Sequence, residues 1–290
     1  MPIWKSILTR PDGIIAVLFL VIVGCAALLA PVIFPEGPWR MVARPFQLPF
    51  QDNGNLLGTD ALGRDMLIMM TYGARTSLGI GLVSTVVAVL LGLTIGGAAG
   101  FFGGRVDSFL MRATEMFQTV PNFALAHLLI AIYSPSITSV VVAISVVSWP
   151  PVARLARAEF LSLRRREFVQ AALLSGQSNL RVALTQVLPN ALSPLIVMAA
   201  LMVSMAILFE SALSFLGLGD PNVVSWGYLI GAARAVISQS WWLTLCLASR
   251  SCSPSLPFPP SAMRSATAKT PSSTAGRQPD DRAFNQQSAS

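Results

Sequence analysis

Long uncharged stretches rich in apolar residues alternate with shorter polar segments along most of this 290-residue chain. A helix that crosses a lipid bilayer needs about 20 consecutive apolar residues. One of the stretches is long enough for two such helices, because a turn-forming segment at residues 133–136 divides it near its middle. The pattern therefore predicts an all-α protein with five full membrane-spanning helices. The uncharged stretches cover residues 13–35, 76–104, 116–153 and 190–209.

Two of these stretches carry features that bear on helix packing. The stretch at 76–104 is rich in glycine, and small residues let membrane helices approach one another closely. Two helices are expected between Ser108 and Pro151, and Pro121 is expected to kink the first of them. Arg112 and Glu115 lie three residues apart near the start of that helix, so they share one face and can form an ion pair.

The pattern changes abruptly near the C-terminus. A sixth membrane helix is expected to begin near Trp241, but the apolar run stops after Ala248. Residues 249–290 are rich in Ser, Pro and Ala, and we expect this tail to be disordered. Codons permitted for residues 249–271, read from their third base, can instead yield an apolar run that ends in Gly-Asp-Ala-Leu-Arg-Asp. We therefore hypothesise that the tail is a frameshift product and that the sixth helix is truncated.

Composition supports assignment to the membrane. Apolar residues make up 53% of the chain, charged residues only 11%, and the mean hydropathy is +0.64. A soluble domain carries roughly 25% charged residues, so this chain is predicted to be an integral membrane protein in the lipid bilayer. The net charge of +7 does not indicate a nucleic-acid partner, because the arginines cluster beside apolar stretches. The three cysteines show no spacing typical of a metal site or a disulfide framework.

The longest polar interval of the central region, residues 154–189, contains six arginines. Apolar residues recur through it at helical spacing, Gly176 can end a helix with a positive φ, and Ser178 can cap a second short helix. Basic loops remain on the cytoplasmic side of membranes, so we expect a helix, a corner and a helix in the cytoplasm. With Lys5 and Arg10 the N-terminus is also cytoplasmic. Five crossings then put residues 36–75, 134–137 and 210–240 outside, and 101–107 and 154–189 inside.

The interval resembles the "EAA loop" of ABC importer permeases, which docks into a cleft on the ATP-hydrolysing subunit. The family usually has Glu where this chain has Gln170, and often Arg where it has Leu173. An ordinary basic cytoplasmic loop is the alternative interpretation. The resemblance implies that the following residues form the ATPase-docking loop: Glu167, Gln170, Ala171, Ala172, Gly176, Leu188 and Pro189.

Two further segments resemble the dipeptide/oligopeptide (and nickel) permease subfamily, and its second-permease (C-type) subunit in particular. The first reads LGTDALGRD at residues 57–65 and is followed by YGARTSL at 72–78. The second reads ESALSFLGLG at 210–219 and is followed by Pro221 and by SWG at 225–227. We expect the first segment to form a turn held by ion pairs among Asp60, Arg64 and Asp65. A metal site built from the two aspartates is a much weaker alternative.

Two ionisable residues are candidates for the pore or its vestibule. His127 is expected at membrane depth, where ionisable groups are often functional, although a neutral histidine bonded to a neighbouring helix explains it better. Glu210 is expected near the outer face. It can line the vestibule or form hydrogen bonds to the turn that it precedes, and the sequence favours neither interpretation.

The resemblance implies a non-enzymatic permease subunit of an ATP-driven importer in the bacterial inner membrane, which moves di- or oligopeptides by alternating access. It also implies separate ATPase subunits, a second homologous permease and an extracytoplasmic substrate-binding protein. The chain contains no phosphate-binding loop of the Walker type, and no cofactor is expected. A secondary transporter or channel, or a membrane assembly protein, remains the alternative. Domain boundaries are predicted as 1–35 (first helix), 36–75 (extracytoplasmic), 76–248 (transmembrane domain) and 249–290 (tail).

Overall fold

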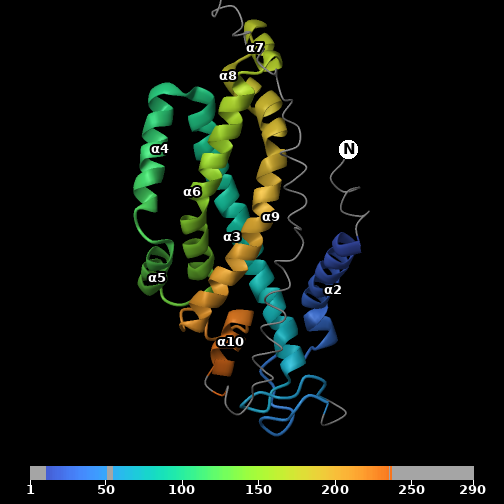
Figure 1. The fold of residues 1–290 in the computed structure, drawn as a ribbon. Coiled ribbons are helices and arrows are strands. Elements are labelled where there is room, and N and C mark those ends of the chain that lie inside the picture. The colour runs from blue at the N-terminus through green and yellow to red at the C-terminus, as the bar shows by residue number, and fades with distance from the viewer. Residues whose placement is uncertain (1–10, 51–54, 235, 237–290) are drawn as a thin grey trace, which may run out of the picture. The chain divides into compact units, whose positions relative to one another are not determined.

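The computed structural model describes residues 11–50, 55–234 and 236, which all belong to one compact unit. In this part of the chain the regular secondary structure is helical, and two isolated backbone bridges are the exception. The helices, shown in Figure 1, are α2 (Pro11–Ile33), α3 (Met66–Phe102), α4 (Gly104–Gln118), α5 (Asn122–Tyr133), α6 (Ile137–Arg164), α7 (Glu167–Leu174), α8 (Asn179–Val182), the π-helical turn η1 (Ala183–Val187), α9 (Leu188–Phe215) and α10 (Trp226–Arg234).

Three helical segments are long and apolar enough to cross a membrane. They are α3, α6, and the continuous run from α8 through η1 into α9. The α4–α5 pair meets the criteria only when taken together, and α2 contributes a shorter apolar helix, Val17–Ile33. The predicted helical membrane protein is therefore confirmed, with three or four candidate crossings in the described residues. The predicted sixth helix at 241–248 and the tail at 249–290 lie outside those residues.

The third predicted crossing is broken rather than kinked. Helix α4 ends at Gln118, α5 begins at Asn122, and the two axes differ by 81°. Pro121 explains the break, because proline lacks a backbone N–H and disfavours helical geometry in the residue before it. The sequence identified the proline correctly but underestimated its effect.

Two other helices are longer than predicted. Helix α3 begins at Met66, ten residues before the expected start, because the Asp65 carboxylate accepts a hydrogen bond from the N–H of Leu67 at 2.7 Å and caps it. Helix α6 continues through Pro150 and Pro151 to Arg164, whereas the predicted helix ended near the second of these prolines. Each proline removes one backbone hydrogen bond, but the close packing of α6 on α3 maintains the helix.

Helix α3 contacts α2, α6, α9 and α10, and its closest neighbour is α6. Glycines at intervals of four residues face α6. A methyl group added to Gly96 would lie 2.0 Å from the carbonyl oxygen of Ala153, and one added to Gly100 would lie 2.5 Å from that of Arg157. The two backbones are therefore in contact through positions where only glycine fits. This confirms the close helix approach that the glycine-rich stretch predicted.

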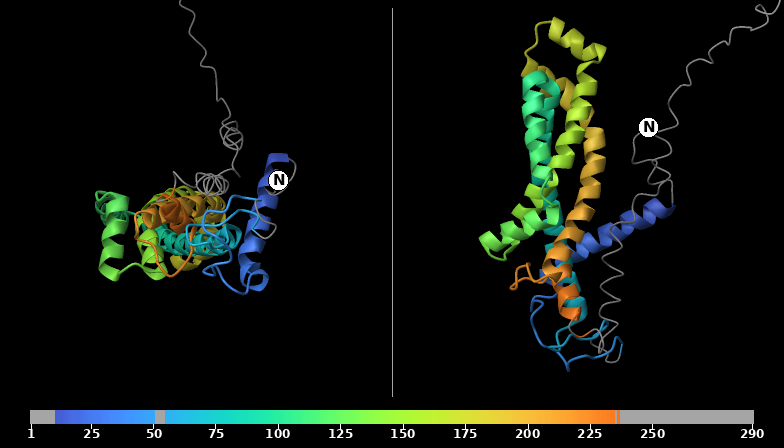
Figure 2. Two further views of the ribbon diagram at one scale, coloured as in Figure 1. Left: turned by 90° about the horizontal axis from the view of Figure 1, so that it is seen from below. Right: turned by 60° about the vertical axis from the view of Figure 1, so that its left-hand side comes forward.

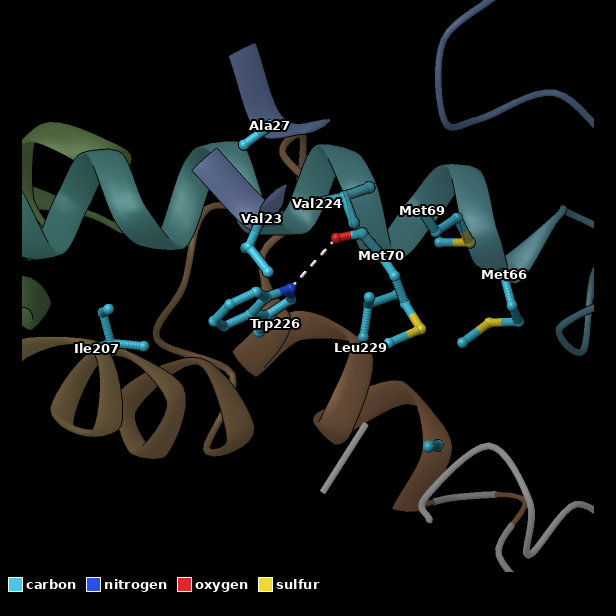
Figure 3. Close-up of a cluster of buried hydrophobic side chains, with 11 residues drawn as sticks. Val23, Ala27, Met66, Met69, Met70, Ile207, Val224, Trp226 and Leu229 are labelled. Carbon is cyan, nitrogen blue, oxygen red and sulfur yellow. Dashed lines mark hydrogen bonds between the residues drawn. The ribbon is translucent and has the colours of Figure 1, made fainter. Parts of the chain in front are cut away.

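Opposite ends of the helix bundle carry different features (Figures 1 and 2). Helices α7 and α8 lie at one end, and α10 lies at the other with the segment between α2 and α3. At this second end, Trp226 of α10 is buried in an apolar cluster with Met66, Met69 and Met70 of α3, and its indole N–H donates to the Met70 carbonyl oxygen at 3.2 Å (Figure 3). The α9–α10 connection is therefore anchored on the first turns of α3.

Candidate functional site

The loop between α6 and α9, residues 165–187, has the predicted helix–corner–helix form. Helix α7 ends at Leu174, Gly176 adopts a φ of +81°, and Ser178 occupies the N-cap position of α8. The Ser178 side chain makes no capping hydrogen bond, so the backbone alone defines the start of this helix. The sequence pattern had joined α7 to α6, but the structure separates them at Arg165 and Arg166.

One face of this loop packs onto the protein's own core. Val169 of α7, Val182 of α8 and Val187 of η1 are fully buried in a cluster with Phe160 of α6 and Phe101 of α3. Ala172 and Leu188 are partly buried against the same cluster. The loop is therefore fixed to the ends of α3 and α6.

The other face of the loop is exposed. It contains an apolar side chain, Leu174, that is 88% exposed, together with Phe168 at 43%. The side-chain amide of Gln170 donates to the Arg164 carbonyl oxygen at 2.8 Å, a bond that an ionised glutamate cannot donate. Of the predicted docking residues, those on this exposed face are Glu167, Gln170, Ala171, Gly176 and Pro189, whereas Ala172 and Leu188 face inward in part.

An ion pair ties the loop end of α6 to the start of α4. The Arg157 guanidinium binds the Asp107 carboxylate through two hydrogen bonds, and the second joins Nη2 to Oδ2 at 2.6 Å. Arg164 donates to the Phe102 carbonyl oxygen at 3.3 Å and lies over the Phe101 ring. Arg112 and Glu115, which were predicted to pair, form no ion pair among the described residues. The loop end of α6 is therefore tied both to the end of α3 and to the start of α4.

A buried polar cluster joins three helices at the opposite end. Glu210 of α9 is 1% exposed, and it accepts hydrogen bonds from the hydroxyls of Ser77 at 3.1 Å and Ser214 at 2.7 Å. The Ser77 hydroxyl in turn accepts the backbone N–H of Trp226 at 3.0 Å. Glu210 thus bonds to the last turn of its own helix through Ser214 and to α3 through Ser77, and its role at a vestibule stays a prediction. The sequence did not single out Ser77, although it is a polar residue inside an apolar stretch.

The segment before α3 is held by side-chain bonds to its own backbone. Asp60 accepts the backbone N–H groups of Leu62 and Arg64, and it forms an ion pair with the Arg64 guanidinium at 2.7 Å. Gly58 and Gly63 both have positive φ, and a methyl group on either would lie about 2 Å from a carbonyl oxygen. The predicted turn with a local ion pair is confirmed for Asp60 and Arg64. Asp65 caps α3 instead.

Two further predictions concern single residues and metal binding. His127 lies on α5 with an exposed side chain, and the structure does not bring it together with Glu210, which is buried on α9. In the described part of the chain no group of three or more His, Cys, Asp or Glu side chains could hold a metal ion.

Comparison with known proteins agrees with these features. Residues 65–248 match the family described as "Binding-protein-dependent transport system inner membrane component". The chain is 37% identical to the di/tripeptide transport system permease protein DppC of Pseudomonas aeruginosa, over 83% of this chain and 81% of that protein. It is 36% identical to the oligopeptide transport system permease protein OppC of Escherichia coli K12, over 80% of this chain and 78% of that protein.

A solved structure shares the fold. A chain of the MetNI methionine ABC transporter, in an inward-facing conformation, superimposes with a TM-score of 0.56 at 15% identity, and the match covers 71% of this chain and 98% of that one. The family match and the relatives each cover well over half of the chain. This protein therefore belongs to the family of inner membrane components of binding-protein-dependent transport systems.

Proposed function

We propose that this chain is the C-type permease subunit of an ATP-driven importer of di- and oligopeptides. The observation that carries the proposal is the loop between α6 and α9. It is anchored on one face by Val169 and Val182, and on the other it presents the exposed Leu174 beside residues that match the EAA spacing. The proposed partners are ATPase subunits, a second homologous permease and an extracytoplasmic substrate-binding protein. The names of the peptide-transporting relatives support the substrate class.

Five crossings with a cytoplasmic N-terminus complete the proposal. The crossings are α2, α3, the bent α4–α5 pair, α6, and the run from α8 to α9. Contacts between loops support this order. The Arg157–Asp107 pair joins the ends of α6 and α4 that are assigned to the inside. The Ile137 N–H and the Asp220 carboxylate, at 3.4 Å, join two segments assigned to the outside. The arginines that flank α7 support a cytoplasmic assignment for this end of the bundle.

The proposed mechanism is alternating access powered by the partner ATPase. When ATP closes the ATPase dimer, the docked α7 moves with it. Because α7 and α8 share one buried cluster with α3 and α6, we expect the movement to tilt these long helices as a unit. No side chain of this chain performs covalent chemistry in that cycle.

A secondary transporter is the competing function. Such proteins often carry ionisable groups paired near the bilayer midplane. In the described part of the chain, the three ion pairs lie in a turn or at the ends of helices: Glu36–Arg40, Asp60–Arg64 and Asp107–Arg157. This distribution favours coupling through a docked partner over coupling through ions in the membrane.

The docking assignment is tested by Leu174→Asp. The Leu174 side chain is almost fully exposed and contributes nothing to the core, so the variant should insert and fold normally. Loss of a central apolar contact at an interface commonly weakens binding by tenfold or more. Co-purification of the ATPase subunit with the chain should therefore fall at least about tenfold.

The matched control is Leu56→Asp, the same substitution at an exposed leucine at the other end of the bundle. It should leave ATPase recovery unchanged. If Leu174→Asp recovers the ATPase at the wild-type level, α7 is not the docking element.

A further inference from the structure

Helix α3 carries one charged residue in its 37 positions, Arg75. The side chain is exposed, and none of the ion pairs among the described residues includes it. A cation within an apolar helix is costly unless it meets an anion or reaches water. The exposed side chain of Arg75 can reach water, and none of the ion pairs among the described residues neutralises it, so its guanidinium is available to an anionic ligand.

Arg75 lies at the edge of a hollow of about 620 Å³ between α3 and the start of α6. This volume falls within the range of about 300–1,000 Å³ that is typical of sites for small ligands. Thr76 and Thr138 contribute hydroxyls to its lining. Gly79, one helical turn beyond Arg75, also lines the hollow, and no atom lies within 4 Å of the position that a methyl group on it would occupy, so the hollow is open at Gly79.

The hollow lies at the end of the bundle that we assign to the outside. Its lining includes Ile137, the first residue of α6, and Val223, which precedes α10. The two carboxylates nearby in the fold have other partners. Glu210 binds Ser77 and Ser214, and Asp220 accepts the backbone N–H groups of Ile137 and Asn222.

We infer that Arg75 binds the free C-terminal carboxylate of the peptide as it enters from outside, an inference that rests on the proposed function. A guanidinium presents two parallel N–H donors that match the two oxygens of a carboxylate. The Thr138 hydroxyl can donate to and accept from the peptide backbone, and the Thr76 hydroxyl, which donates to the Tyr72 carbonyl oxygen at 3.4 Å, can accept. The hollow is thus an entry site for a short peptide with one terminal negative charge.

Cysteine labelling tests this inference without ATP turnover. The full-length chain, with its native cysteines replaced by serine, is assembled with its partners in vesicles. Gly79→Cys then places a thiol in the hollow that Arg75 also lines. Saturating trialanine should slow its reaction with an external maleimide, and trialanine amide, which lacks the carboxylate, should slow it far less. In the Gly79→Cys, Arg75→Gln double variant, trialanine and trialanine amide should slow the reaction of the thiol with maleimide equally.

Uptake gives an independent readout. Wild-type complex should prefer trialanine over its amide, and Arg75→Gln should reduce that preference by roughly tenfold, the effect of losing a charge-assisted hydrogen bond. Arg75→Lys should retain part of it. All variants use the same binding protein, so its own selectivity does not affect the change in preference between the wild type and a variant.

Two results would overturn the inference. One is an equal loss of uptake of trialanine and of its amide in Arg75→Gln, which would indicate that Arg75 pairs with a carboxylate on the second permease. The other is a loss of uptake in Arg75→Gln that appears only in vesicles with anionic lipid, which would indicate that Arg75 binds a lipid phosphate head group. Failure of the proposed function is distinguishable, because it abolishes ATP-dependent uptake in the wild type while leaving carboxylate-dependent protection of the thiol intact.

Discussion

The Ser77 hydroxyl donates a hydrogen bond to Oε2 of Glu210 at 3.1 Å, although 133 residues separate the two along the chain. Ser77 also accepts the backbone N–H of Trp226. These three residues come from the three signature segments at 72–78, 210–219 and 225–227. Three of the segments that resemble the peptide permease subfamily therefore meet at one buried hydroxyl, and together they fix α10 and the end of α9 to α3.

We predict that Ser77→Ala destabilises this end of the protein. The substitution removes a donor to a buried carboxylate and an acceptor for a buried N–H, and such losses cost about 1–3 kcal/mol. The midpoint of thermal unfolding in detergent should fall relative to the wild type. Ser162→Ala, at an exposed position on α6, is the control and should leave the midpoint unchanged. An unchanged midpoint in Ser77→Ala would show that the cluster contributes no stability.

Gly96→Ala should disrupt the contact between α3 and α6. Its new methyl group would lie 2.0 Å from the Ala153 carbonyl oxygen, and relieving such an overlap typically costs about 1–3 kcal/mol. Gly79→Ala is the matched control on the same helix, where the methyl group meets no atom within 4 Å. The midpoint of unfolding in detergent should therefore be lower for Gly96→Ala than for Gly79→Ala. Equal stability would mean that α3 and α6 are not in backbone contact.

The sequence predicted the long helical segments and where the docking loop turns, because apolar periodicity and Gly176 are local signals. It did not predict α10, which lies in the stretch expected to be an outer loop. It did not predict the full break at Pro121 or the length of α3, which depend on how strongly neighbouring helices hold the backbone. Partners distant in the chain were also missed. Arg157 pairs with Asp107, fifty residues away, whereas the sequence suggested the local pair Arg112–Glu115.

Cysteine accessibility should show that α8 is cytoplasmic. In a chain without its native cysteines, Ser178→Cys is exposed and should react with membrane-impermeant maleimide only from the cytoplasmic side. Leu56→Cys, on the segment before α3, should react only from outside. The arginines around α7 are the physical reason for this orientation. Reversed labelling would contradict both the orientation and the docking of α7 on a cytoplasmic ATPase.

The hypothesis of a frameshifted tail has a direct test at the DNA level. The family match ends at residue 248, where the composition changes. Resequencing should reveal a third-base frame after this residue that encodes an apolar run ending in Gly-Asp-Ala-Leu-Arg-Asp. Restoring that frame should increase assembly with the second permease. A third-base frame without the apolar run would disprove the hypothesis.

ATP-dependent peptide uptake by reconstituted vesicles tests the central proposal most directly. The vesicles would contain this chain, the second permease and the ATPase, with the binding protein on the outside. We predict accumulation of a labelled tripeptide that requires both ATP and the binding protein, and that Leu174→Asp abolishes while Leu56→Asp does not. Uptake driven by an ion gradient without ATP, or uptake unaffected by Leu174→Asp, would contradict the account.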